Sequence, residues 1–226
     1  ARLAKVEALR GAGVDPYPVV FSPTVSAAAL QEAHAGLAAG EGSGRRETVA
    51  GRLVTMRRMG GLAFGVVQDG SGRLQLYADA AGLGDRLDAF VDLDPGDWVG
   101  ASGEVIRTRR GELSIRVEDF SLLAKALRPL PEKWHGLQDV EVRHRRRYLD
   151  LATNPQARRV LAARSRIVAS LRRSLDERGF LEVETPILQG QAGGALAKPF
   201  VTHHNALGVD MYLRIAIELH LKRLIV

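Results

Sequence analysis

The feature that most restricts the fold is a series of five short runs between residues 47 and 123 in which apolar and polar residues alternate. The runs read ETVAGRLVTM, LAFGVVQD, GRLQLYAD, DWVGASGEVI and ELSIRVEDF. Because successive side chains of a β-strand point to opposite faces, this spacing predicts strands with one buried face. The turn sequences DGSG and RRGE join two pairs of runs, and a helical run, GLGDRLDAFVDL, lies between the third and the fourth.

Five short strands with one interposed helix predict an all-β, five-stranded Greek-key barrel of the oligonucleotide-binding (OB) type. In the third run, Leu74 and Leu76 share one face and Gln75 lies on the other. Glu112 lies on the polar face of the fifth run, opposite its apolar residues. The face of Phe64 is not decided, because LAFGVV is apolar on both faces.

Two interpretations of Phe64, Gln75 and Glu112 follow. In the first, a base stacks on the ring and its edge is read by an amide and a carboxylate, as single-stranded RNA is read. In the second, Phe64 belongs to the core and the other two residues are solvated surface. The pattern alone favours the second interpretation.

The chain divides into four predicted parts. Residues 1–46 form a helical appendage, with a short amphipathic helix followed by proline- and alanine-rich sequence. Residues 47–123 form the OB-fold domain, residues 124–153 a linker, and residues 154–226 the start of a second domain.

The linker contains the charged sequence EVRHRRRYLD. Its arginines, Arg143, Arg145, Arg146 and Arg147, either line a phosphate-binding surface or belong to a solvated connector whose charges are satisfied by neighbouring acids. For a run of charges the second interpretation is the more usual one.

The second domain is predicted to begin with a helix at residues 155–178, which carries one apolar stripe. The sequence FLEVETP then alternates as a strand up to Pro186, and a glycine-rich loop, QGQAGGALAKPF, follows it. Glycine lets a backbone approach a ligand closely, so this loop either frames a small-molecule site or is an ordinary turn. The sequence MYLRIAIELHLKRLIV begins as a strand and continues with helical spacing.

The composition restricts the kinds of site and the cellular compartment that this chain can have. The 226 residues carry a formal net charge of +6, which is compatible with a polyanionic partner. Cysteine is absent, which excludes disulfides and thiolate metal sites. No apolar run approaches the ~20 residues that span a bilayer. We therefore expect a cytoplasmic protein with no membrane segment in this chain.

Several motifs together resemble lysyl-tRNA synthetases, which are class II aminoacyl-tRNA synthetases. GFLEVETPILQ is similar to motif 1 of class II enzymes, a helix and strand ending in a proline at the dimer interface, here Pro186. The segments AKALRPLP, RRRYLDL, GGALAKPF, THHNAL and MYLRIAIELHLKR are similar to segments typical of lysyl-tRNA synthetases. GRLQLYAD and RRGELSI resemble the anticodon-binding domain of the family.

The resemblance implies roles for individual residues. Gly194 matches the position that contacts bound lysine, and Glu218 the position that takes its α-ammonium group. Phe64, Gln75 and Glu112 match the residues that stack on and read the central uridine of the anticodon. The resemblance thus reverses the interpretation that the pattern favours.

The implied fold after the OB barrel is the beginning of an α+β catalytic domain with an antiparallel sheet and helices. The implied function is ATP- and Mg²⁺-dependent activation of L-lysine to lysyl-adenylate, followed by transfer to tRNA(Lys), by a homodimer. Motifs 2 and 3, with the arginine that grips ATP and the carboxylates that hold Mg²⁺, are expected beyond Val226. We therefore expect no metal ligand among these residues and no activity of the 226-residue chain by itself. The catalytic residues are unknown, because the residues that grip ATP are expected beyond Val226.

The family commonly has proline where this sequence has Ile217. Two alternatives to a complete ligase stay open: a truncated, non-catalytic RNA-binding paralogue, and the synthetase part of a larger lysyl-transferring fusion protein.

Overall fold

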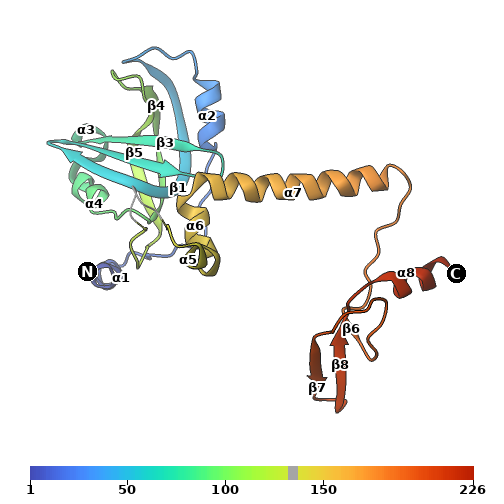
Figure 1. Ribbon diagram of the computed structural model, residues 1–226. Helices are drawn as coiled ribbons and strands as arrows, with labels where there is room; N and C mark the ends of the chain where they lie inside the picture. Colours follow the sequence, from blue (N-terminus) through green and yellow to red (C-terminus); the bar gives the residue numbers. More distant parts are fainter. Residues whose placement is uncertain (132–136) are drawn as a thin grey trace. The chain divides into compact units, whose positions relative to one another are not determined.

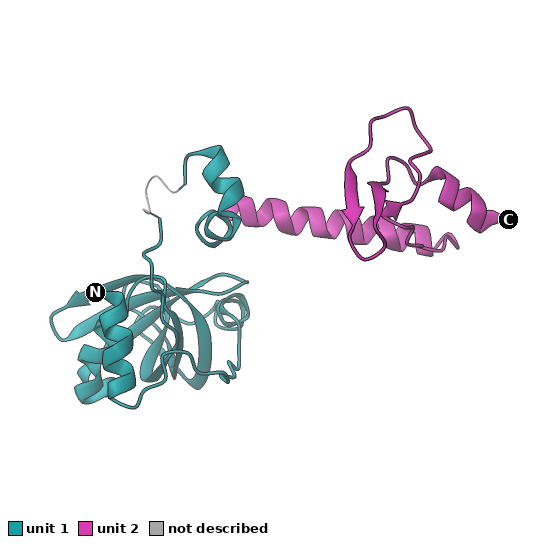
Figure 2. Ribbon diagram, turned by 90° about the horizontal axis from the view of Figure 1, so that it is seen from below, with its two compact units in different colours: residues 1–154 teal, residues 155–226 magenta. Residues whose placement is uncertain are grey.

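The computed structural model describes residues 1–131 and 137–226, which fold as two compact units, residues 1–154 and residues 155–226 (Figures 1 and 2). The elements of the first unit are α1 (Arg2–Gly11), α2 (Ala27–Ala33), β1 (Gly42–Met59), β2 (Leu62–Gln68), β3 (Arg73–Asp79), α3 (Ala80–Leu83), the 3₁₀ turn η1 (Gly84–Arg86), α4 (Leu87–Val91), β4 (Trp98–Arg107), β5 (Leu113–Ala124), α5 (Val140–Arg145) and α6 (Arg147–Thr153). Those of the second unit are α7 (Pro155–Asp176), β6 (Leu188–Gln189), β7 (Val201–His204), β8 (Val209–Leu213) and α8 (Glu218–Ile225).

The five predicted strands form a closed barrel in the order β1-β2-β3-β5-β4, with β1 pairing to both β2 and β4 (Figure 1). All pairs are antiparallel except β3 and β5, which run parallel and place Gln75 beside Ser114. The predicted helical run is present between β3 and β4 as α3, η1 and α4. Closure leaves no edge strand in the barrel, which removes the unpaired backbone groups of an open sheet.

One face of every strand fills the barrel. The predicted core positions of β3 and β5 are buried: Leu74, Leu76, Leu113, Ile115 and Val117. Phe90 of α4 is also fully buried and makes an edge-to-face contact with Phe120, with 5.2 Å between ring centroids. Because the apolar residues fill the inside, the alternate residues of each strand face away from the core and are available for other contacts.

A cluster of charged residues attaches α1 to the barrel. The ammonium of Lys125 at the end of β5 is almost fully buried and lies 2.8 Å from the buried carboxylate of Asp97, and it also pairs with Asp94. Lys5 of α1 lies 3.3 Å from Asp94, and Arg2 donates to the backbone carbonyls of Pro95, Ala126 and Arg128. Burial alone would raise the pKa of Asp94, but hydrogen bonds and charge interactions with Lys125 and Lys5 outweigh burial and lower it.

Most arginines of the charged linker sequence form ion pairs with acidic residues of the linker itself. The buried carboxylate of Asp150 in α6 lies 3.1 Å from Nε of Arg143 and 2.5 Å from Nη1 of Arg147, and Arg145 pairs with Glu141 at 2.6 Å. Burial would raise the pKa of Asp150, but hydrogen bonds from Asn154 and Arg143 and the charges of Arg143 and Arg147 lower it. These pairs favour the solvated connector over a phosphate-binding surface.

The second unit confirms the predicted helix but not the predicted strand. Helix α7 starts at Pro155, and Gly179 follows its end at φ +80°, a conformation that glycine adopts easily. Residues 180–186 form no strand, so the strand predicted up to Pro186 is wrong. A strand needs a neighbour for its backbone hydrogen bonds, and of residues 180–189 only Leu188 and Gln189 pair with another strand, β8.

The rest of the second unit is a three-stranded antiparallel sheet, in the order β6-β8-β7, followed by α8. The predicted change from strand to helix is therefore present, with β8 ending at Leu213 and α8 beginning at Glu218.

Candidate functional site

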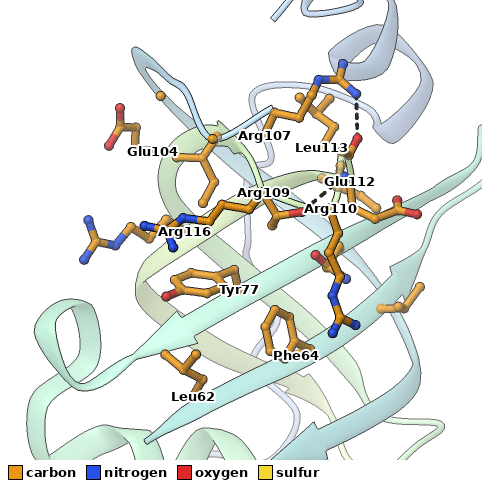
Figure 3. Close-up of a pocket in the computed structure, with 18 of the residues that line it drawn as sticks. Leu62, Phe64, Tyr77, Glu104, Arg107, Arg109, Arg110, Glu112, Leu113 and Arg116 are labelled. Atoms are coloured by element: carbon orange, nitrogen blue, oxygen red, sulfur yellow. Dashed lines mark hydrogen bonds between the residues drawn. The ribbon is translucent and has the colours of Figure 1, made fainter. Parts of the chain in front are cut away.

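A groove of about 1500 Å³ on the outside of the barrel brings together Phe64, Gln75 and Glu112. Figure 3 shows this groove with Phe64 and Glu112 labelled. Its lining comes from α2, from β1 to β5, and from the loop between β4 and β5. The three residues are separated by up to 48 positions in the sequence, and the barrel topology alone brings them to one surface.

Phe64 faces the groove rather than the core. In β2 the buried residues are Ala63, Gly65 and Val67, and Phe64 lies on the opposite face, partly exposed. Its ring contacts that of Tyr77 on β3 edge-to-face, with 5.5 Å between centroids (Figure 3). The interpretation of Phe64 as a core residue is therefore wrong, because small and branched side chains fill the inside of the barrel at β2.

Gln75 is held in place by a neighbouring strand. The hydroxyl of Ser114 on β5 donates to Oε1 of Gln75 at 2.8 Å. The amide nitrogen of Gln75 has no partner among the residues that the structure describes. The side chain thus presents a hydrogen-bond donor to the groove.

Glu112 lies at the end of a tight loop between β4 and β5. The carbonyl of Glu112 accepts from the backbone N–H of Thr108 at 2.9 Å, and its own N–H donates to the Thr108 hydroxyl at 3.2 Å. Gly111, at φ +87°, makes the turn possible, and Arg107 donates to its carbonyl at 2.8 Å. The exposed carboxylate of Glu112 has no partner within residues 1–131 and 137–226.

The groove contains further residues that the sequence interpretation did not include. Tyr77 shares the face of Gln75, so the alternation contained a signal for it. Burial, with the nearby charge of Asp79, raises the pKa of Tyr77. Arg116 lines the groove together with Asp79. Its Nη2 and Nε donate to Oδ2 of Asp79 at 2.9 and 3.2 Å.

Cations gather around this groove. Arginines contribute to its lining from β1, β3, the end of β4, the following loop and β5: Arg57, Arg73, Arg107, Arg109, Arg110 and Arg116. Arg109 and Arg110 are exposed and lie in the loop that ends at Glu112 (Figure 3). An aromatic ring, a donor, an acceptor and a cationic rim are the combination with which proteins bind single-stranded nucleic acid.

A second candidate site lies in the other unit, around Gly194 and Glu218. Gly194 adopts φ +91°, and a Cβ placed on it would lie 3.1 Å from Cβ of Ala216. The glycine-rich loop therefore packs against the turn that precedes α8. Glu218, in the first turn of α8, is exposed and accepts from the ammonium of Lys222 at 2.5 Å. This hydrogen bond and the charge of Lys222 lower the pKa of Glu218.

Pro186 lies on neither site. It is exposed, and it follows Thr185, whose hydroxyl and carbonyl accept from Arg214 at 2.5 and 2.9 Å.

Among residues 1–131 and 137–226, no group of three or more histidines and carboxylates is placed to hold a metal ion. In the same part of the chain, no helix is both long and apolar enough to cross a membrane.

Comparison with protein families gives two matches. Residues 47–123 match the OB-fold nucleic acid binding domain, and residues 139–226 match the class II tRNA synthetases of the D, K and N type. Among curated proteins, the chain is 52% identical over its whole length to the lysine–tRNA ligase of Parasynechococcus marenigrum (strain WH8102). The chain belongs to the lysyl-tRNA synthetase family.

Other lysyl-tRNA synthetases give the same result. The lysine–tRNA ligases of Thermosynechococcus vestitus and Moorella thermoacetica are each 51% identical over the whole chain. The chain spans 45% to 46% of the length of these three relatives. The predicted fold class, an OB barrel followed by the beginning of a class II synthetase domain, is confirmed.

Proposed function

We propose that this chain supplies the anticodon-reading domain and part of the lysine-binding domain of a lysine–tRNA ligase, which joins L-lysine to tRNA(Lys) with ATP and Mg²⁺. In this proposal residues 47–123 bind the anticodon, after the appendage of residues 1–46, and residues 124–153 link them to the catalytic domain that begins at residue 154. The observation that supports the proposal best is the convergence of Phe64, Gln75 and Glu112 on one groove.

The groove is complementary to uridine. A pyrimidine ring stacks on Phe64, with cations of the rim near the phosphates of the loop. The Watson–Crick edge of uridine offers a carbonyl oxygen at position 4 and a donor at N3. The amide nitrogen of Gln75 donates to the oxygen, and the carboxylate of Glu112 accepts from the donor. Cytidine has an amino group at position 4 and no proton at N3, so it fits neither group.

Glu218 is suited to bind the α-ammonium group of lysine. Its carboxylate already binds an ammonium, that of Lys222, and a substrate ammonium replaces it with the same geometry and charge. Gly194, where a Cβ would lie 3.1 Å from Cβ of Ala216, lets the glycine-rich loop pack closely against the turn that precedes Glu218, and the substrate is proposed to lie against this backbone.

We propose that the ligase is a homodimer in the cytoplasm, and helix α7 supports the homodimer. A stripe of its apolar side chains is exposed in the second unit: Val160, Ile167, Val168, Leu171 and Leu175. A two-fold axis buries such a stripe against its own copy, together with the segment at Pro186. Leu171→Glu is expected to produce monomers in sedimentation at micromolar concentration, and Arg166→Glu, a charge change at an exposed arginine on the opposite face of α7, to leave dimers.

Binding of anticodon stem-loop RNA tests the function. The 226-residue chain is expected to bind a loop with a central uridine more tightly than the same loop with a central cytidine, and binding is expected to weaken as salt rises. Equal affinity for the two loops would refute the proposed role of the groove, whatever the absolute affinity. In a chain of the relatives' full length, lysine-dependent exchange between pyrophosphate and ATP tests the ligase activity separately.

A further inference from the structure

Ser114 is a buried polar residue for which the function described so far gives no role. It is fully buried on β5, directly beside Gln75 in the parallel pairing of β3 and β5. The other buried polar residues of the barrel, Asp79, Asp97 and Lys125, form ion pairs or cap a helix. Within the described part of the chain, the side chain of Ser114 makes polar contacts with two groups only. Both groups belong to residues that are proposed to read the base.

The hydroxyl proton of Ser114 goes to Gln75. Its oxygen lies 2.8 Å from Oε1 of Gln75 and 3.3 Å from the backbone carbonyl of Glu112. Hydrogen bonds from hydroxyls to oxygen span about 2.5–3.0 Å, so only the contact to Gln75 has a normal length. The carbonyl of Glu112 also already accepts from the N–H of Thr108 at 2.9 Å.

This hydrogen bond decides which end of the amide faces the groove. With Oε1 bound to Ser114, the amide nitrogen of Gln75 points to the ligand and donates. If the amide turned by 180°, its oxygen would face the groove and accept instead; its nitrogen would then donate to Oγ of Ser114, and the hydroxyl proton would have only the longer 3.3 Å contact to the carbonyl of Glu112. A donor fits the carbonyl oxygen of uridine, whereas an acceptor fits the amino group of cytidine.

We propose that Ser114 is a positioning residue that fixes the orientation of the Gln75 amide and thereby makes the groove select a base with a carbonyl at position 4 over a base with an amino group there. Because Ser114 is buried on a strand, it acts through Gln75 and does not touch the RNA. This inference rests on the proposed function of the groove.

The test compares Ser114→Ala with wild type in the 226-residue chain, with labelled stem-loop RNAs that differ only in a central uridine or cytidine. Loss of one hydrogen bond is expected to lower the ratio of the two affinities about two- to tenfold, by weakening the uridine complex and strengthening the cytidine complex. Ser121→Ala is the matched control, because Ser121 lies on the same strand, half-buried, opposite Gly100 and outside the groove. Ser114→Thr, which keeps the hydroxyl, is expected to retain the ratio.

A second arm repeats Ser114→Ala in a Gln75→Ala background. There the contribution of the amide to the ratio is already lost and only that of Glu112 is left, so removal of the hydroxyl is expected to change nothing further, since its effect passes through the amide. The inference would be overturned if Ser114→Ala weakened the binding of both loops equally, or if it lowered the ratio of affinities by the same factor with and without Gln75. Either result would indicate that Ser114 only supports the structure. A wild-type ratio retained in Ser114→Ala would overturn it as well. If wild type itself fails to distinguish the two loops, the proposed function fails, and the inference fails with it.

Discussion

Phe64→Ala is expected to weaken binding of an anticodon stem-loop with little loss of stability. Stacking of a base on an aromatic ring contributes about 1–3 kcal/mol, so the affinity is expected to fall about 5- to 150-fold. Because Phe64 is partly exposed and lies outside the buried core, its removal costs less than the ~3–5 kcal/mol of a core Phe→Ala change. The edge-to-face contact with Tyr77 accounts for about 0.5–1.5 kcal/mol of that smaller cost.

The assay is fluorescence anisotropy with a stem-loop RNA, titrated at several salt concentrations. Phe64 is proposed to contact a base and no phosphate. The slope of log affinity against log salt is therefore expected to be unchanged in Phe64→Ala, while the affinity falls. Phe21→Ala is the matched aromatic control. The ring of Phe21 lies against Gly100 of β4, outside the groove, and its loss is expected to leave RNA binding intact.

A loop with an abasic central nucleotide supplies the decisive comparison. Wild type and Phe64→Ala are expected to bind it with the same affinity, since there is no base to stack. If Phe64→Ala weakens binding of the abasic loop as much as that of the uridine loop, the ring supports the fold of the groove rather than a base, and the stacking argument is refuted.

Three further predictions concern other residues. Glu112→Gln is expected to lower the preference for a central uridine over cytidine more than it lowers overall affinity, measured with the same two loops; an unchanged preference would contradict the role of the carboxylate. Asp94→Asn is expected to lower the free energy of unfolding by about 1.5–3 kcal/mol at pH 7 in urea titrations, through the lost charged hydrogen bond to Lys125. Since the folded-state pKa of Asp94 is below its ordinary 3.8, this contribution is present above that pH and is lost as the pH falls through the folded-state value, so wild type and variant are expected to converge in acid. In a chain of the relatives' full length, Gly194→Ala, at φ +91°, is expected to raise the KM for lysine in pyrophosphate exchange, whereas Gly193→Ala, whose Cβ would make an ordinary 3.4 Å contact, is not; equal effects would remove the argument from backbone conformation.

The barrel was predictable from sequence because each strand has two different environments. Where one face is apolar and the other polar, as at Leu74, Gln75 and Leu76, alternation alone assigns the faces correctly. At Phe64 it fails, because the groove face of β2 is as apolar as the core face, and only the three-dimensional structure separates them.

The contacts within the sites depend on pairings that no local pattern contains. The hydrogen bond between Ser114 and Gln75 joins residues 39 positions apart through a parallel pairing of strands. The strand predicted up to Pro186 fails for a related reason, since alternation describes an amphipathic segment but does not supply the neighbour that a strand needs. The pair of Glu218 and Lys222, by contrast, lies at i and i+4 of one helix, a spacing that the sequence alone contains.

The attachment of α1 to the far end of the barrel sets an order for folding during synthesis. Arg2 donates to the carbonyls of Ala126 and Arg128, so the first helix has no complete binding surface until more than 120 further residues have left the ribosome. At ~5–20 residues per second this takes roughly 6–25 s. A helix of 10 residues is marginal in water without tertiary contacts, so α1 stays unfolded over that interval. Helix α1 is therefore synthesised before the barrel but folds only after β5 is complete, and a nascent chain probed by protease is expected to be cut in residues 2–11 until then.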